Sequence, residues 1–180
     1  MYFVISDIHG DYESLLQAFE FYDKSKFDGI IICGDLLFDG SFFSRTKSSQ
    51  SCLDLLNEYA EDILACRGNN DISKDLEELK FEVDDEFGLY EIYGRKMLLT
   101  HGHLYYETRL PEVGDNDIYM SGHTHMPRAD FAYGMYMLNP GSVSSPRGGY
   151  PKTYGVLNER GFEVFDFKGN IIKEVTFHGN

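Results

Sequence analysis

The first 70 residues alternate short apolar runs with segments of helical periodicity. Residues 2–6, 28–33 and 62–66 are continuous apolar runs, as expected for strands buried on both faces. Residues 11–24 repeat apolar side chains at helical spacing, and residues 52–59 predict a second helix. Strand–helix–strand units of this kind predict a parallel sheet with right-handed crossovers.

The second half of the chain has a different pattern, with short alternating segments separated by turn residues such as Gly94 and Gly134. The predicted strands are 81–86, 88–93, 95–100, 128–133, 135–138, 153–158, 161–167 and 170–177. We expect antiparallel hairpins here, and a solvated helix surface and strand edge over residues 74–86. Two facing sheets with helices outside accommodate both halves in one α/β domain, residues 1–180.

Residues 38–51 are polar, Ser-rich and aperiodic, which predicts a loop. Within the stretch 38–50, three phenylalanines and Arg45 favour either a substrate rim or the subunit contact of a homo-oligomer, and the sequence does not choose between them. The phenylalanines are Phe38, Phe42 and Phe43.

Composition and charge narrow the class of protein. The chain has 180 residues with 42% hydrophobic side chains, which suits one soluble globular domain. No apolar run approaches the roughly 18 residues of a membrane span, and the N-terminal residues enter a strand pattern without a basic leader segment. We therefore expect a cytoplasmic protein with no membrane partner. The net charge of −14 argues against long nucleic acids as partners, because a polyanion needs basic patches.

The three cysteines are widely spaced and form no CxxC motif. Cys33, Cys52 and Cys66 are therefore interpreted as small buried hydrophobic residues in a reducing compartment.

Candidate chemistry is concentrated where predicted strands give way to glycine-containing turns. Five of the six histidines fall into three tight groups, which are His9, the pair His101 and His103, and the pair His123 and His125. Between them, Gly34-Asp35 and Gly68-Asn69-Asn70-Asp71 each follow an apolar run directly. Since loops at the carboxyl ends of strands converge in an open sheet, we expect these side chains to share one pocket.

The spacing and types of these residues predict metal binding. Positions i and i+2 of an extended segment face the same side, so that Asp7 with His9, and His123 with His125, are each expected to aim two donor atoms together. Imidazole, carboxylate and amide donors without thiolate favour Mn, Fe, Zn or Co. The seven donors suit two divalent ions roughly 3.5–4 Å apart that share one carboxylate, for which we favour Asp35. The predicted ligands are Asp7, His9, Asp35, Asn69, His101, His123 and His125.

Two such ions would reverse the local sign of charge. They bring about +4 against −2 from the two aspartates, which leaves the site at about +2, or about +1 once a bridging hydroxide is bound. A site of this charge within a protein of net charge −14 suits a phosphodiester monoanion. The ions would lower the pKa of the bridging water and so generate the nucleophile for hydrolysis.

The order of these motifs resembles the calcineurin-like metallophosphoesterases and, within them, the small YfcE-type phosphodiesterases. The similar motifs run along essentially the whole chain: Asp-Ile-His-Gly, Gly-Asp, Gly-Asn-Asn-Asp, Leu-Thr-His-Gly-His-Leu, Gly-His-Thr-His-x-Pro and the stretch from Asn139 to Gly149. The resemblance implies a four-layer α/β/β/α sandwich and a Mn²⁺-dependent dinuclear phosphodiesterase acting on small phosphodiesters. It also implies that one metal takes Asp7, His9, Asp35 and His125 and that the other takes Asp35, Asn69, His101 and His123.

One position departs from the wider superfamily, in which a histidine often follows the Gly-Asn pair. Here Asn70 stands in that place, and an amide donates hydrogen bonds but supplies no proton. The enzyme is therefore expected to prefer good leaving groups or to use another acid, for which His103 is the candidate. Arg147 is either a phosphate contact or a surface arginine, and residues 139–142 are either a structural turn or a wall of the metal pocket.

Two other functions remain open. One is a phosphomonoesterase, which Asn70, the short chain and the acidic charge disfavour. The other is a catalytically silent scaffold like the retromer subunit that resembles this fold but lacks a complete ligand set. The completeness of the seven ligand positions favours an enzyme over the scaffold.

Overall fold

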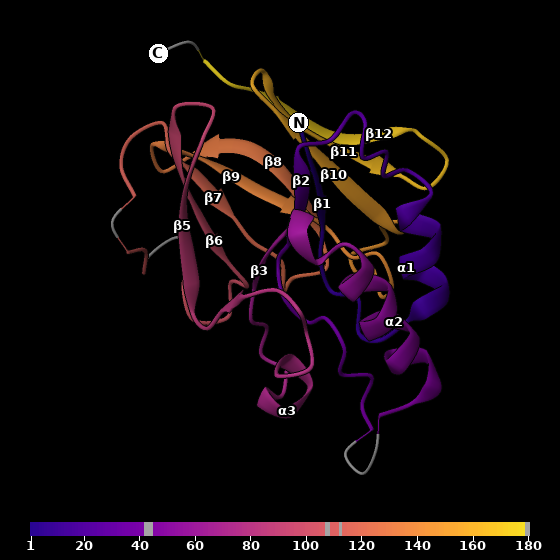
Figure 1. The fold of residues 1–180 in the computed structure, drawn as a ribbon. Coiled ribbons are helices and arrows are strands. Elements are labelled where there is room, and N and C mark those ends of the chain that lie inside the picture. The colour runs from indigo at the N-terminus through magenta and orange to yellow at the C-terminus, as the bar shows by residue number, and fades with distance from the viewer. Residues whose placement is uncertain (42–44, 107–108, 112, 179–180) are drawn as a thin grey trace.

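The computed structural model describes residues 1–41, 45–106, 109–111 and 113–178, and the predicted loop residues Phe42 and Phe43 lie outside this part. Two sheets face each other, and the helices are attached to the first of them (Figure 1). The first sheet has the order β12-β11-β10-β1-β2-β3-β4. Its strands are β1 (Tyr2–Ile5), β2 (Gly29–Ile32), β3 (Ile63–Cys66), β4 (Val83–Asp84), β10 (Thr153–Asn158), β11 (Gly161–Asp166) and β12 (Ile171–Thr176).

Within the first sheet, β1 to β4 are parallel and β10 to β12 are antiparallel to their neighbours. The second sheet has the order β5-β6-β7-β9-β8, with β6, β7 and β9 parallel. Its strands are β5 (Phe87–Ile92), β6 (Arg95–Thr100), β7 (Ile118–Met120), β8 (Pro127–Ala132) and β9 (Met135–Pro140). The carboxyl ends of five parallel strands, three from one sheet and two from the other, therefore lead into the loops that carry the predicted ligands.

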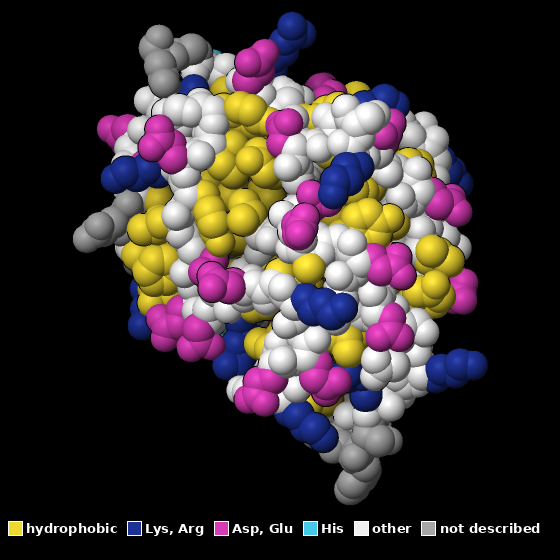
Figure 2. All heavy atoms as spheres, viewed as in Figure 1, with side chains coloured by type: hydrophobic (Ala, Val, Ile, Leu, Met, Phe, Trp, Pro, Cys, Tyr) yellow, Lys and Arg dark blue, Asp and Glu magenta, His cyan; other side chains and the backbone are white. Residues whose placement is uncertain are grey.

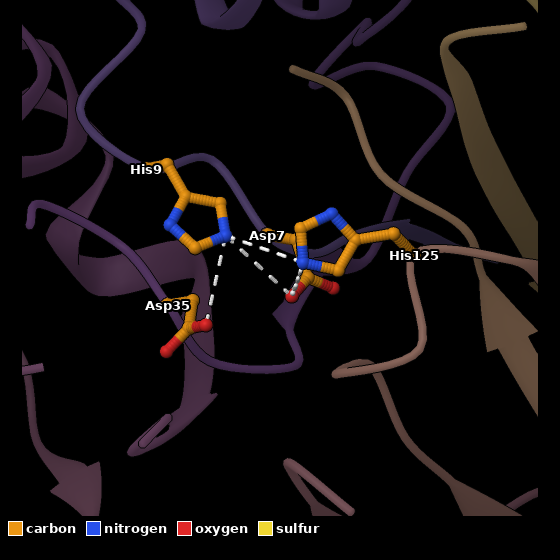
Figure 3. A group of neighbouring side chains, drawn as sticks. All are labelled: Asp7, His9, Asp35 and His125. Carbon is orange, nitrogen blue, oxygen red and sulfur yellow. Dashed lines mark hydrogen bonds and ion pairs between the residues drawn. The ribbon is translucent and has the colours of Figure 1, made fainter. Parts of the chain in front are cut away.

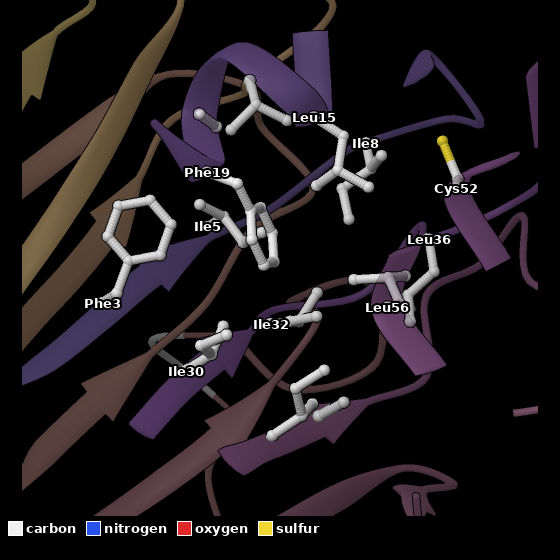
Figure 4. Packing of buried hydrophobic residues seen from close by; sticks show 14 of the residues in the cluster. Phe3, Ile5, Ile8, Leu15, Phe19, Ile30, Ile32, Leu36, Cys52 and Leu56 are labelled. Carbon is white, nitrogen blue, oxygen red and sulfur yellow. The ribbon is translucent and has the colours of Figure 1, made fainter. Parts of the chain in front are cut away.

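Alternation along the central strands fills the two sides of the first sheet. One side of the sheet faces α1 (Tyr12–Phe19) and α2 (Lys47–Glu58). The strand residues on this side pack with Leu15, Phe19 and Leu56 of the helices, and they are Phe3, Ile5, Ile30 and Ile32 (Figure 4). Val4 and Ile31 point the other way into the core between the sheets, which Met97, Ile118 and Tyr136 complete. This two-sided burial explains why the strands read as continuous apolar runs.

The outer face of the second sheet carries a smaller cluster of Leu98, Tyr119, Met135 and Met137. Leu110 and Val113, from the connection between β6 and β7, pack against it. The predicted α/β fold with two facing sheets is confirmed. The expected four-layer sandwich has helices on the outer face of the second sheet. In the described part of the chain, the segment between β6 and β7 covers this face instead of helices.

Several predicted boundaries were wrong. The first helix ends at Phe19, because Phe21 stacks on Tyr154 with ring centroids 4.7 Å apart and so draws the chain onto the sheet. The second helix begins at Lys47 instead of residue 52, since Thr46 caps it by accepting a hydrogen bond from the Ser49 NH group (3.2 Å).

One short strand differs from the sequence prediction as well, whereas the helix surface expected at the start of residues 74–86 is present. The strand β7 was missed, and its parallel pairing with β6 and β9 contradicts the expectation of antiparallel hairpins throughout the second half. Residues Ser73–Leu76 form the short helix α3 within the expected charged surface.

No helix in the described ranges is both long and apolar enough to cross a membrane. On the face drawn in Figure 2, acidic and basic side chains are interspersed, so this face presents no continuous basic stripe of the kind that a long nucleic acid requires.

Candidate metal centre

The predicted ligands converge at the carboxyl ends of the parallel strands. Asp7 and Asp35 follow β1 and β2, Asn69 follows β3, His101 follows β6, and His123 follows β7. The structure therefore brings together ligands that are up to 118 residues apart in the sequence (Asp7 and His125), as expected of loops at strand ends.

Four of the ligands form a compact group in which donor atoms lie within 4.8 Å of one another. Their side chains point toward one another from the loops after β1 and β2 and from the loop that contains His125 (Figure 3). Nε2 of His125 lies 3.1 Å from Oδ1 of Asp7, and Nε2 of His9 lies 3.6 Å from Oδ2 of Asp35. The two imidazoles approach each other with 3.4 Å between their Nε2 atoms.

The remaining ligands adjoin this group through Asp35. Nε2 of His101 is 3.3 Å from Oδ2 of Asp35 and 3.1 Å from Oδ1 of Asn69. The ring of His123 lies edge-on to that of His101, with centroids 5.1 Å apart. Oδ2 of Asp35 therefore faces a histidine on each side, which is the position expected of a shared carboxylate.

The backbone at the ligands is not extended. The predicted extended conformation of the pairs Asp7/His9 and His123/His125 was therefore wrong. Asp7, His9, His123 and His125 have φ values of 53°, 50°, 64° and 58°, and Asp35 has a φ of 54°. These values lie in the left-handed region, which costs a residue with a Cβ roughly 1–2 kcal/mol. Such strain is concentrated at functional sites, where the surrounding structure holds it in place.

Hydrogen bonds between neighbouring loops hold this strained backbone. The NH groups of Asp7 and His9 donate to the carbonyls of Gly34 (3.1 Å) and Asp35 (3.0 Å), so the loop after β1 lies along the loop after β2. On the other side of Asp7, the hydroxyls of Ser142 and Ser144 both donate to its carbonyl, at 2.9 and 2.8 Å. The site thus has a built wall, which favours the second of the two interpretations of residues 139–142.

Asp71 is a functional residue to which the sequence analysis assigned no role. It is buried, and its carboxylate accepts hydrogen bonds from the NH groups of Asp35 (2.9 Å), Leu36 (2.7 Å) and Gly68 (2.8 Å). In the sequence, only its position within Gly-Asn-Asn-Asp indicated that Asp71 lies near the ligands. Asn70 also holds Asp35, since its NH and side-chain amide donate to the two carboxylate oxygens at 2.9 and 2.7 Å.

The tautomers of two histidines suit a cation. Nδ1 of His101 lies 2.6 Å from the carbonyl of Cys33, and Nδ1 of His125 lies 2.6 Å from the carbonyl of Ser145. A carbonyl oxygen only accepts, so each Nδ1 carries the proton, and in the neutral ring Nε2 presents a lone pair. Burial lowers the pKa of His125 and favours this neutral form.

Without a cation, the lone pair of His125 would face Oδ1 of Asp7, which is buried and has no hydrogen-bond partner among the described residues. Two acceptors held 3.1 Å apart repel each other unless they share a proton or a positive ion lies beside them. The donor set therefore fits a divalent metal, and the unpartnered oxygen supports this fit.

The carboxylates respond oppositely to their surroundings. Burial raises the pKa of Asp7 to about 6. Burial would also raise the pKa of Asp35, but hydrogen bonds from His101 and Asn70 outweigh it and lower the pKa below its ordinary value. Asp35 is therefore ionised before any metal binds, whereas ionisation of Asp7 becomes favourable only when positive charge is close to it.

Two further candidate side chains, His103 and Arg147, neighbour proposed ligands, whereas Arg45 is paired elsewhere. His103 is half-buried beside His101 and His123, with ring centroids 5.5 and 6.1 Å away, and its Nδ1 atom has no hydrogen-bond partner in the part of the chain that the structure describes. The side chain of Arg147 is exposed, while its NH group donates to the carbonyl of His125 (3.1 Å) and its charge helps to lower the pKa of that residue. Arg45 pairs with Asp75 (2.6 Å) and Glu78 (3.0 Å), which fixes this end of the 38–50 loop to the segment around α3.

Comparison with known proteins identifies the family. The model of the calcineurin-like phosphoesterase superfamily domain matches residues 1–161. The chain belongs to this superfamily. It is 34% identical over 155 residues to the phosphodiesterase YfcE of Escherichia coli K12, with 85% of this chain and 84% of that protein covered.

Two further similarities cover nearly the whole chain. A probable metallophosphoesterase of Bacillus subtilis, YsnB, is 29% identical over 186 residues, covering 96% of this chain and 94% of that protein. The solved structure of the Escherichia coli phosphoesterase YfcE superposes with a TM-score of 0.90 at 32% identity, over 98% of this chain and 99% of the other. Membership of this superfamily confirms the prediction of a metal-dependent phosphoesterase with the fold described above.

Proposed function

We propose that this metal-dependent phosphodiesterase hydrolyses small phosphodiesters with two divalent ions, for which we favour Mn²⁺, held by the seven ligands. The observation that carries the proposal is the orphaned, buried Oδ1 of Asp7 beside the lone pair of His125. The first ion would be held by Asp7, His9, Asp35 and His125. The second would be held by Asp35, Asn69, His101 and His123. This set is supported by the distances from Nε2 of His101 to Oδ2 of Asp35 (3.3 Å) and to Oδ1 of Asn69 (3.1 Å), and by the ring of His123 beside that of His101.

When bound, such ions lower the pKa of a coordinated water to generate the nucleophile and neutralise charge that develops on the phosphoryl oxygens. The chain's own residues position these groups. Asn70 holds both oxygens of Asp35, and the carbonyls of Cys33 and Ser145 orient His101 and His125. Donor–acceptor pairs of this kind fix the ligand orientation and raise the basicity of the imidazole.

The choice of a diester follows from charge. The site would carry about +2 with both ions bound, and the rest of the protein is strongly acidic, with a net charge of −14 over the whole chain. A diester monoanion is repelled less by this surface than a monoester dianion is. Asn70, which supplies no proton, further favours diesters with good leaving groups.

A metal-reconstituted assay tests the proposal. Bis(p-nitrophenyl) phosphate and p-nitrophenyl phosphate are compared after loading with Mn²⁺, Zn²⁺, Fe²⁺ or Co²⁺, and the number of ions per chain is measured by elemental analysis. We expect about two ions per chain, faster turnover of the diester, and a loss of about 100-fold or more in Asp35→Asn. The exposed Asp54→Asn is the matched control.

Each alternative predicts a different result in this assay. Faster turnover of the monoester would favour a phosphomonoesterase. The absence of metal-dependent turnover of both esters in fully loaded protein would favour the scaffold.

We further propose a cytoplasmic location, which is supported by the free, buried thiols of Cys33, Cys52 and Cys66.

A further inference from the structure

A groove of about 380 Å³ begins at the proposed metal ligand Asn69 and is lined also by Arg67, Asp85, Glu86, His103 and Leu104. Its size suits a small organic group. Because Asn69 belongs both to the groove and to the proposed ligand set, a phosphate held at the metals would lie next to the groove.

The charges along this groove are unequal. Arg67 is the one residue with a full positive charge among the described side chains that line it, and its guanidinium is already committed. Nη1 lies 2.9 Å from Oδ1 of Asp85, Nε donates to the carbonyl of Asp71 (3.2 Å), and Nη2 donates to the hydroxyl of Ser73 (3.3 Å). The positive charge of Arg67 is therefore offset by Asp85.

Glu86 keeps its negative charge. It is exposed, and its Oε2 accepts a hydrogen bond from the hydroxyl of Tyr105 at 2.7 Å, which is a neutral donor. The guanidinium of Arg109 lies on the face of the same tyrosine ring, 5.7 Å from its centroid, and no ion pair between Arg109 and Glu86 is found among the described residues. The carboxylate of Asp71, the remaining acidic group of the lining, is satisfied by main-chain NH groups. The groove thus repels anions, although the metal centre beside it attracts them.

We propose that this groove holds one ester arm of the substrate and that Asp85 and Glu86 restrict that arm to uncharged or cationic groups. This inference rests on the proposed function. The metals would select for the phosphodiester anion, and the groove would select against a second negative charge on the alcohol. The substrate class would then exclude diesters whose alcohols carry carboxylate or further phosphate groups.

Symmetric diesters test this without ambiguity about which arm enters the groove. Bis(4-carbamoylphenyl) phosphate and bis(4-carboxyphenyl) phosphate are similar in shape and differ in the charge of both arms. Their kcat/KM values are measured with the metal-loaded protein, and each is also tested as a competitive inhibitor of bis(p-nitrophenyl) phosphate hydrolysis, so that slow chemistry does not conceal binding. The variants are Glu86→Gln, Asp85→Asn and, as the matched control, Glu174→Gln on β12, at the opposite edge of the first sheet from β4.

We expect the wild-type protein to prefer the carbamoyl compound by about tenfold in kcat/KM or in inhibition constant. Glu86→Gln should reduce this preference by about threefold at low ionic strength, and Asp85→Asn should reduce it at least as much because it also releases Arg67. The effect should shrink as salt is added. Glu174→Gln should leave the preference unchanged.

If Glu86→Gln and Asp85→Asn alter the preference no more than Glu174→Gln does, the groove does not hold the arm and the inference is wrong. A wild-type protein that binds both compounds equally would overturn it too. Failure of the proposed function is a distinct result, since the metal-loaded protein would then hydrolyse no bis(p-nitrophenyl) phosphate.

Discussion

The carboxylate of Asp71 accepts a hydrogen bond from the main-chain NH group of Asp35, with 2.9 Å between Oδ2 and N. The same oxygen lies 2.8 Å from the NH group of Gly68, so one buried atom ties the loop after β2 to the loop after β3. These loops carry Asp35 and Asn69, one on each side of this link. The relative position of two proposed ligands therefore depends on a residue that is not itself a ligand.

Replacing Asp71 with asparagine should weaken both the fold and the metal site. An amide presents one acceptor oxygen where the carboxylate presents two, and its NH₂ group would face a main-chain donor. We expect a loss of about 2–3 kcal/mol in the free energy of unfolding and a fall of about 10- to 100-fold in metal affinity. Urea denaturation and calorimetric metal titration measure the two effects, with the exposed Asp54→Asn as control. Wild-type affinity in Asp71→Asn would contradict the role assigned to this residue.

Gly122→Ala should damage the site by steric overlap. A Cβ atom at residue 122 would overlap the Ser6 hydroxyl and lie only 2.8 Å from the Cys33 carbonyl and 2.9 Å from Oδ2 of Asp7. The last two groups hold or form part of the metal centre, so we expect metal affinity to fall by at least tenfold. Gly114→Ala is the control, because its Cβ would meet Oδ2 of Asp117 at an ordinary 3.5 Å. Equal metal binding by the two variants, measured by titration, would show that the Gly122 contacts yield without cost.

The fold could be predicted where the order of apolar and polar residues along the chain determines the element. The run at Ile30–Ile32 is buried on both faces and could be assigned from its apolar character alone. The strand β7 could not, because it has only three residues and its parallel partners β6 and β9 are set by tertiary packing. The first turn of α2 was missed for a related reason, since its buried residue is the polar Ser49, which donates to the carbonyl of Leu37 (2.6 Å).

The candidate site was predictable in composition but not in conformation. Ligand positions follow from motifs at strand ends, and these required no knowledge of the packing. The left-handed backbone of Asp7 is different, because it is held by Ser142 and Ser144, more than 130 residues away in the sequence. Long-range bonds of this kind leave no local signal, which is also why Asp71 received no role.

Metal binding should weaken as the pH falls through about 6. Burial raises the folded-state pKa of Asp7 from about 4 to about 6, so in the metal-free protein its contribution to stability is full below pH 4 and is lost as the pH rises through 6. A metal requires the ionised form and displaces the proton below pH 6. We therefore expect the affinity to drop by about tenfold per pH unit below 6 from Asp7 alone.

Calorimetric titration with Mn²⁺ at pH 5, 6 and 7, in buffers of different ionisation enthalpy, would measure both the affinity and the protons released. His101 should steepen the dependence, because its hydrogen bond to Asp35 outweighs burial and raises its pKa. An affinity that is the same at pH 5 and pH 7 would contradict the competition between proton and metal at Asp7.

His103 is the remaining candidate for the acid that protonates the leaving group, and this role can be separated from a packing role. It lines the same groove as Asn69. Burial lowers its pKa and so favours the neutral ring, which must take up a proton before it can act as an acid. If it donates a proton, His103→Ala should slow diesters of poor alkyl leaving groups by about 100-fold while changing p-nitrophenyl esters by only a few-fold, because a nitrophenolate leaves without protonation. The measurement is kcat/KM across a series of diesters of rising leaving-group pKa, with His178→Ala, outside the metal centre, as the control. An equal drop across the series would instead assign His103 to packing against His101 and His123.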